Sequence, residues 1–278
     1  MSPHFTALTA VLLCLLGFGV GVFGTLVGAG GGFILTPVLL LVYPQSSPAL
    51  ITAISLVVVF FNAGSGSVAY ARQRRIDFQS GSVFAVCTLP GSIAGVLLAD
   101  KVSRPGFDVI MGVALTALAW WLVRGRRRRE KPHRVAGQLR VIVDRDGNEY
   151  RYHANVRLGA AFSVVVGFVS SFLGIGGGVV HVPLLVTVLG FPTHVATATS
   201  HFVLAWMALV ATLTHVVTGT FHGGVGLRRA AALSVGVVFG AQLGAMLSQR
   251  LSGTVIQRLL AVALLALGVR LVLSVLLS

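Results

Sequence analysis

The sequence has few charged residues. Asp, Glu, Lys and Arg make up 10% of its 278 residues, whereas a soluble domain carries about a quarter. No charged residue at all occurs in residues 1–71 or in residues 158–227. Because ~20 apolar residues cross a bilayer as a helix, each of these stretches can supply more than one span. They exclude a soluble globular protein and indicate an all-α, polytopic membrane protein.

Cysteine and catalytic motifs are also scarce. Cys14 and Cys87 lie in apolar segments and show no CxxC or Cys/His spacing, which argues against disulfides and zinc. The histidines between residues 181 and 222 show neither H-x3-H nor HExxH spacing. GxSxG is absent and the acids lie mostly in loops, so no Ser/His/Asp arrangement is expected. We therefore expect no enzyme, no catalytic residue, no bound metal and no cofactor.

The basic residues that are present gather in one place. Of 21 Lys and Arg residues, 11 lie between Arg124 and Arg157, together with four of the seven acids. This stretch separates apolar segments, so nucleic-acid binding is not the reason for its charge. A short Lys/Arg-rich loop is typical of the cytoplasmic face. We expect it in the cytoplasm, with contact between Arg126–Arg129 and lipid headgroups as a weaker additional interpretation.

Gly, Pro and charged residues divide the rest of the chain into apolar segments. They lie near 5–27, 33–43, 48–71, 78–99 and 107–123 in the first half and near 157–173, 179–189, 194–218, 227–248 and 254–276 in the second. The run 5–27 has no basic leader and is interpreted as a retained span. We expect three parts: a transmembrane repeat over 1–123, a cytoplasmic loop over 124–156 and a second repeat over 157–278.

Within the loop, residues 141–152 alternate β-forming side chains around Asp146-Gly147. That dipeptide tolerates the positive φ of a tight turn, which favours a small β-hairpin. An ordered linker is the alternative, since an isolated hairpin is marginally stable in water.

The two halves share a motif. Gly28-Ala-Gly-Gly-Gly-Phe-Ile-Leu-Thr-Pro37 and Gly174-Ile-Gly-Gly-Gly-Val-Val-His-Val-Pro183 both read G-x-G-G-G-x4-P, at an offset of 146 residues. A twofold repeat of about 4–5 segments per half is typical of secondary transporters. Five crossings per half would invert the second copy and four would not. Arg228 and Arg229 would be cytoplasmic only in the four-crossing case, so the sequence leaves both arrangements open.

The shared glycines are expected to break the helices. Each Gly costs ~1 kcal/mol relative to Ala inside a helix, and a break within a membrane must line protein or water. If a helix restarts after the break, its free N–H groups form an anion site; the alternative is close packing of helices. The candidate binding residues here are Gly28, Gly30, Gly31, Gly32, Gly174, Gly176, Gly177 and Gly178.

Hydroxyl and histidine side chains near the motifs complete the candidate site. Thr52 and Ser55 match Thr197 and Ser200, each pair at i, i+3 spacing on one face of a span. Such hydroxyls can donate to an anion or bond the backbone of their own helix. His201, beside Ser200, could accept a proton that accompanies the anion. The remaining candidates for a proton or charge role are His215, Arg72 and Arg75.

The Gly-rich pair, the stretch Gly190-Phe-Pro-Thr-His-Val-Ala-Thr-Ala-Thr-Ser-His201 and the central Asp-Arg-Asp-Gly-Asn resemble the TauE/SafE family of membrane proteins over nearly the whole chain. The resemblance implies export of sulfite, sulfoacetate or related anions across a bacterial inner membrane. The expected partners are this substrate and lipid, without nucleic acid, and self-association is compatible with the sequence. The alternatives are a membrane scaffold or assembly factor, and an anion channel.

Overall fold

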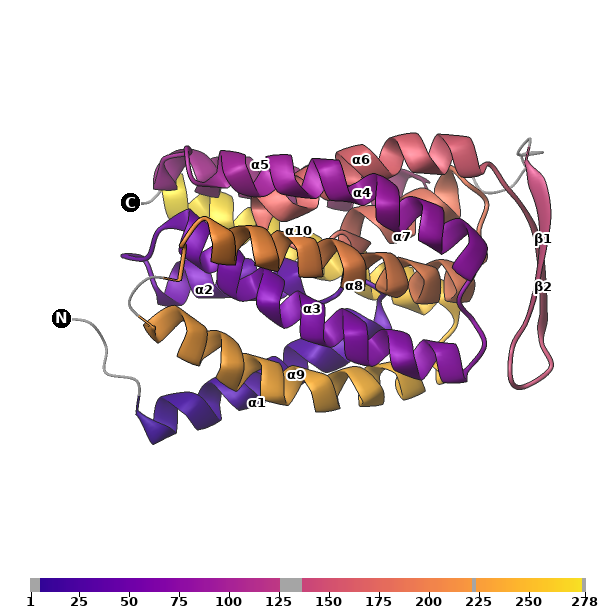
Figure 1. The fold of residues 1–278 in the computed structure, drawn as a ribbon, viewed down its shortest axis with the longest axis horizontal. Helices are drawn as coiled ribbons and strands as arrows, with labels where there is room; N and C mark the ends of the chain where they lie inside the picture. The colour runs from indigo at the N-terminus through magenta and orange to yellow at the C-terminus, as the bar shows by residue number, and fades with distance from the viewer. Residues whose placement is uncertain (1–5, 126–136, 222–223, 277–278) are drawn as a thin grey trace.

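Ten helices and one β-hairpin occur in residues 6–125, 137–221 and 224–276, which are the parts of the chain that the computed structural model describes (Figure 1). The first half holds α1 (Ala7–Leu26), α2 (Gly32–Val42), α3 (Pro48–Arg72), α4 (Phe78–Ala99) and α5 (Arg104–Gly125). The second holds α6 (Val156–Leu173), α7 (Gly178–Thr187), α8 (Thr193–Val217), α9 (Val225–Arg250) and α10 (Gly253–Leu276). Six described helices, α1, α3, α4, α6, α8 and α9, are long and apolar enough to cross a membrane. The prediction of a helical, polytopic membrane protein is confirmed.

Polar residues between the apolar segments begin several helices. Ser47 accepts a hydrogen bond from the N–H of Leu50 at the start of α3. Asp77 accepts one from Ser80 in the same way at the start of α4, and Asn155 does so at the start of α6. A side-chain oxygen at this position satisfies one of the N–H groups that a helix start leaves unpaired. The few polar residues of the chain therefore mark helix boundaries.

The chain runs back and forth between two ends of the bundle. Both termini lie at one end, at the left of Figure 1, and the hairpin lies at the other. At the terminal end, Arg104 of α5 donates to the carbonyl of Ser46, and Arg229 of α9 lies 3.7 Å from the ring centre of Tyr43. At the hairpin end, Arg145 donates to Gln73 after α3. α1 therefore starts at the terminal end and α6 at the hairpin end.

Helix pairs are held together by close backbone contact. α1 packs on α9, where a methyl group at Gly17 would lie 2.2 Å from the carbonyl oxygen of Leu233. α4 packs on α6, where a methyl at Gly91 would lie 2.0 Å from that of Val164. Small residues allow this approach in a membrane. Each helix of the first half has an equivalent in the second, from α1 and α6 to α5 and α10. Exchanging equivalents turns the α1–α9 pair into α6–α4 and the α3–α9 pair into α8–α4, and all four pairs are in contact.

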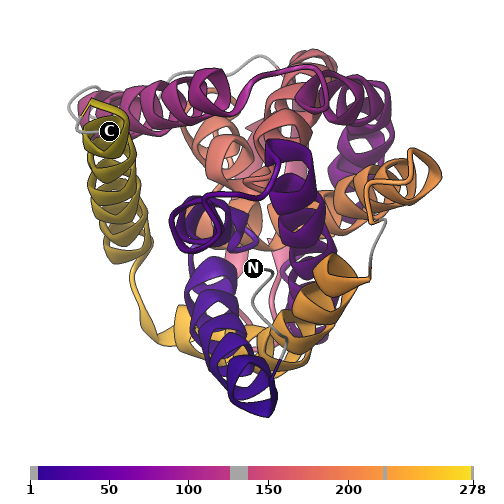
Figure 2. The same ribbon diagram turned by 90° about the vertical axis from the view of Figure 1, so that its left-hand side faces the viewer.

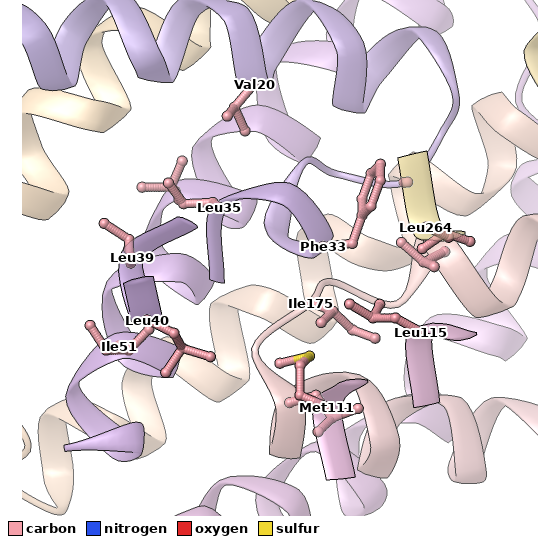
Figure 3. Packing of buried hydrophobic residues seen from close by; sticks show 14 of the residues in the cluster. Val20, Phe33, Leu35, Leu39, Leu40, Ile51, Met111, Leu115, Ile175 and Leu264 are labelled. Atoms are coloured by element: carbon pink, nitrogen blue, oxygen red, sulfur yellow. The ribbon is translucent and has the colours of Figure 1, made fainter. Parts of the chain in front are cut away.

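The largest hydrophobic cluster surrounds the segment between α1 and α2. Phe33, Ile175 and Met111 are fully or almost fully buried in it, and Figure 3 shows Ile175 beside Met111 and Leu115. Leu264 of α10 belongs to the same cluster. α5 and α10 pack on each other at the periphery, where the C-terminus lies beside them in Figure 2.

A two-stranded antiparallel hairpin joins the halves, with β1 at Gln138–Val143 and β2 at Glu149–Ala154. Its turn includes Gly147 at φ +84°, the conformation expected from the Asp-Gly dipeptide. One face of the hairpin packs on the bundle, where the Tyr152 ring lies 4.5 Å from that of Phe191. The strands extend beyond the expected residues 141–152 because this contact buries Tyr152 and Ala154.

Candidate functional site

Each Gly-rich motif interrupts a helix. α1 ends at Leu26 before α2 begins at Gly32, and α6 ends at Leu173 before α7 begins at Gly178. The backbone φ is positive at Gly28 (+77°), Gly30 (+74°), Gly31 (+80°), Gly174 (+64°) and Gly176 (+72°). Glycine adopts this region without the steric cost that other residues have. We call residues 28–32 the first break and residues 174–178 the second break.

The two breaks lie directly against each other. A methyl group at Gly32 would lie 2.7 Å from the carbonyl oxygen of Ile175, and one at Gly178 would lie 2.1 Å from that of Gly28. The start of each break thus opposes the end of the other. Only hydrogen at Cα permits this approach, so the repeated glycines are needed for contact between the halves as well as for their turns.

Each break presents the free end of a helix. The N-caps of α2 and α7 are Gly31 and Gly177, which have no side chain to bond the first N–H groups. Within the described residues, the backbone N–H groups of Gly32, Phe33, Gly178 and Val179 donate to no protein acceptor. Unpaired N–H groups and the positive dipole end make a helix start suitable for an anion.

The four predicted hydroxyls divide into two kinds. Ser55 donates to the carbonyl of Gly174 at 2.7 Å, and Thr52 bonds its own helix at Ala49, 2.9 Å away. Thr197 and Ser200 are buried, and their hydroxyl oxygens have no partner among the described residues. Thr197 packs against the first break. The structure therefore leaves two hydroxyls available on α8 and uses the two on α3.

His201 contacts Thr25 at the end of α1, just before the first break, in a polar group that also includes Asn62 and Tyr70. Its Nε2 lies 3.3 Å from the hydroxyl of Thr25, and that hydroxyl donates to Oδ1 of Asn62 at 2.8 Å. Tyr70 donates to the backbone oxygen of Thr25 at 2.7 Å. Thr25 carries no signal in the sequence, because a hydroxyl within an apolar span is common. Asn62 does, as an amide within an apolar span.

The remaining candidates lie away from the breaks. His215 lies within 3.1 Å of Thr220 after α8, toward the terminal end. Arg75 is buried at the hairpin end and pairs with Asp144 at 3.1 Å, while Arg72 is exposed in the last turn of α3. The structure thus brings His201 to the site, and it does not bring His215, Arg72 or Arg75 there.

Arg75 instead links the hairpin to the bundle through its ion pair with Asp144. Burial would raise the pKa of the Asp144 carboxyl, but hydrogen bonds from Asn148 and from Arg75 outweigh it and hold that pKa at about 2. Tyr152 donates to Asp77 at 2.8 Å, and burial, together with this carboxylate, raises the Tyr152 pKa. Both contacts join the hairpin to the α3–α4 turn and persist at neutral pH.

Comparison with known proteins agrees with this architecture. Residues 13–271 match the family described as Sulfite exporter TauE/SafE. The chain belongs to the TauE/SafE family. It is therefore a multi-pass membrane protein of a transporter family and not an enzyme. The resemblance noted in the glycine motifs is confirmed.

Relatives of this TauE/SafE protein carry transporter names. The "Probable membrane transporter protein YunE" of Bacillus subtilis is 30% identical over 270 residues, which cover 94% of this chain and 97% of the relative. The "Probable membrane transporter protein MJ0441" of Methanocaldococcus jannaschii is 26% identical over 87% of both chains. A "Probable membrane transporter protein" of Xylella fastidiosa is 26% identical over 86% of this chain and 84% of the relative. No solved structure matches the chain.

Proposed function

We propose that this TauE/SafE protein is a secondary transporter of small sulfur-containing anions, such as sulfite, sulfoacetate and related organosulfonates. The substrate binds between the first and second breaks, and access alternates between the two ends of the bundle. The observation that carries the proposal is that two uncapped, buried helix starts, Gly32 and Gly178, each pack directly against the other break. The family description supplies the substrate class.

Backbone and hydroxyl donors suit this substrate class. Sulfite and sulfonates present several oxygen atoms that accept hydrogen bonds. The free N–H groups of α2 and α7 and the hydroxyls of Thr197 and Ser200 supply donors without a fixed charge. No Lys or Arg occurs in residues 1–71 or 158–227, which hold both breaks. Binding through dipoles lets the anion leave again, as transport requires.

We infer that the halves are inverted repeats. α1 and α6 start at opposite ends of the bundle, and helix contacts recur when the halves are exchanged. Five segments per half, with α2 and α7 as re-entrant returns from the breaks, account for this path. Inverted repeats around a central site support alternating access, because each half can adopt the conformation of the other. The repeats then comprise residues 1–123 and 157–278.

The hairpin end is proposed to face the cytoplasm. The basic residues at this end include Arg72 and Arg75 after α3 and Arg140, Arg145 and Arg151 of the hairpin, whereas Arg104 and Arg229 lie at the other end. An excess of Lys and Arg in short loops marks the cytoplasmic side. The membrane is then the bacterial inner membrane, with both termini outside, and export runs from the hairpin end to the terminal end.

A flux assay tests this function. The purified protein in liposomes should show saturable uptake of sulfite, and sulfoacetate, taurine and sulfate should compete to different degrees. Gly31→Leu with Gly177→Leu should abolish flux at normal expression, while Gly19→Leu with Gly64→Leu, where a new side chain meets open space, should retain it. Indifference to all four anions would overturn the sulfur-anion proposal. Non-saturable flux would favour a channel, and misassembly alone a packing role.

Proton coupling through histidine is a separate part of the proposal. His201 lies 3.3 Å from Thr25, at the end of α1 that leads into the first break, and is the candidate to take up a proton with the anion. Its test is sulfite flux measured against an imposed pH gradient. His201→Gln should remove the response to the gradient, and His215→Gln, away from the breaks, should leave it. An unchanged response in the variant with both substitutions would exclude the coupling.

A further inference from the structure

Gly177 differs from the other glycines of the two breaks. Five of them have a positive φ, and a methyl group at Gly32 or Gly178 would meet backbone atoms at less than 3 Å. Gly177 has φ −57°, in the helical region. The three atoms nearest to a methyl group there belong to side chains and lie 3.2 to 3.4 Å away. The backbone thus permits a side chain at Gly177, and its absence leaves a small space beside the start of α7.

A buried hydroxyl lies at this space. Oγ of Ser170 is 3.4 Å from the methyl position of Gly177, and the other two nearest atoms are Sδ of Met207 and Cγ1 of Val166. Ser170 is fully buried, and its hydroxyl has no partner among the described residues. A thioether accepts hydrogen bonds only weakly and a methyl group not at all. Since buried polar groups are normally hydrogen-bonded, the Ser170 hydroxyl is available to a ligand in this space.

The other serines of α6 show that this hydroxyl is exceptional. Ser171 bonds Ser92 at 2.8 Å, and Ser163 donates to the carbonyl of Gly159 at 2.7 Å. The backbone of Ser170 is also used, because its carbonyl accepts the N–H groups of Gly174 and Ile175 in the turn of the second break. Of the three serines in α6, only Ser170 has a side chain without a protein partner.

The start of α7 supplies further donors beside Gly177. The N–H groups of Gly178 and Val179 donate to no acceptor within the described residues, and helix N–H groups and Cα–Cβ bonds both point toward the N-terminal end of a helix. We propose that one oxygen of the transported anion occupies the space beside Gly177 and accepts hydrogen bonds from the start of α7 and from the Ser170 hydroxyl. This inference rests on the proposed function.

An oxygen atom fits this space better than carbon does. Hydrogen-bonded oxygens approach each other to about 2.5–3.0 Å, whereas a methyl group at Gly177 would already be close to its neighbours at 3.2 Å. The donors here are a hydroxyl and peptide N–H groups, which carry no charge that would hold the anion permanently. Ser170 is therefore a substrate-binding residue for an oxyanion, and Gly177 keeps its place open.

Neighbouring serines test the assignment by sulfite flux in liposomes and thermal unfolding in detergent. Ser170→Ala should raise KM about tenfold, the value of one hydrogen bond to a charged group, and leave Tm unchanged. Ser171→Ala is the matched control: it loses the bond to Ser92 and should lower Tm with KM kept. An unchanged KM in Ser170→Ala would overturn the role of this hydroxyl.

Gly177→Ala provides a second test that does not depend on Ser170. Its methyl group fills the space, so KM for sulfite should rise about tenfold or more. Tm should be equal or higher, because alanine at a helical φ restricts the unfolded chain. A lower Tm with an unchanged KM would show that Gly177 serves packing and would overturn the inference. If the wild type shows no saturable anion flux, the proposed function itself fails, so the two failures are distinguishable.

Discussion

The first and second breaks derive from the same motif but are stabilised in different ways. The carbonyl of Gly174 accepts hydrogen bonds from both Thr36 and Ser55, each at 2.7 Å. The equivalents of these two residues in the second half are Val182, which has no hydroxyl, and Ser200, whose hydroxyl is unpaired. The second break is thus held by side chains, whereas the hydroxyl beside the first is unused.

The backbone conformation also differs at the last residue before each helix restarts. Gly31, the N-cap of α2, has φ +80°, whereas Gly177, the N-cap of α7, has φ −57° in the helical region. The duplicated glycines therefore set the place of each break but not its detailed conformation. The carbonyl that two hydroxyls hold is at the second break, and the unpaired hydroxyls of Thr197 and Ser200 lie on the helix that packs against the first.

The largest effect should come from filling the contact between the breaks. Gly178→Ala places a methyl 2.1 Å from the carbonyl oxygen of Gly28, where the obstacle is backbone. Overpacking of this kind typically costs about 1–3 kcal/mol or more. We expect loss of flux together with a lower Tm in detergent. Gly64→Ala, which meets open space, is the control, and full flux through Gly178→Ala would show that the breaks do not need this contact.

Removing one hydroxyl from each side should separate binding from stability. Ser200→Ala should raise KM for sulfite and leave Tm unchanged, because the hydroxyl has no protein partner. Ser55→Ala should lower stability by about 1 kcal/mol, since it loses a bond to Gly174, with a smaller change in KM. The measurements are flux kinetics and thermal unfolding of the same preparations. A lower Tm for Ser200→Ala together with a higher KM for Ser55→Ala would contradict the assignment of Ser200 to binding and of Ser55 to stability.

The smallest effect concerns the hairpin, which precedes α6 and so is attached to the half with the second break. The pKa of Asp144 is lowered from 3.8 to about 2. A lowered pKa means that its contribution is present above about pH 4 and is lost as the pH falls toward 2. Asp144→Asn should loosen the hairpin at neutral pH, seen as faster amide exchange at residues 138–154, and should show less change on acidification.

An equally protected hairpin in Asp144→Asn would show that the contact of Tyr152 with Asp77 suffices. Arg151→Gln is a control for loss of charge, because Arg151 lies exposed on β2 and pairs with Glu149. Sulfite flux in both variants tells whether docking of the hairpin affects the two breaks.

Helix positions were predictable in nearly every case. The segment expected near 48–71 is α3 at Pro48–Arg72, because Ser47, Pro48 and Arg72 mark its ends. The segment expected near 107–123 begins earlier, at Arg104. Pro105 suggested a boundary, but proline is tolerated in the first turn of a helix, where its missing N–H has no partner to lose. Local composition carries this information, so errors are confined to helix ends.

The site was predictable only in part. The sequence singled out the eight glycines and His201 because a repeated motif and a histidine in an apolar span stand out, and the structure places these glycines in the two breaks. Asn62 was noticeable as a polar group, and its link to Thr25 was not. Arg75 was a candidate cation at a span end, but it is buried against Asp144 of the hairpin, 69 residues away. Which polar groups share a partner depends on distant contacts that composition does not encode.

The sequence by itself determined that the chain lies in a membrane, that it carries the same glycine motif twice and that the helices break at these glycines. These properties follow from hydropathy, spacing and the conformational freedom of glycine, all of which are local. Only the tertiary structure decided that the breaks oppose each other, that Ser55 bonds the second break and that Arg75 pairs with Asp144 of the hairpin. Those outcomes depend on packing between α1 and α9, α4 and α6, and α3 and α8, residues far apart in the chain.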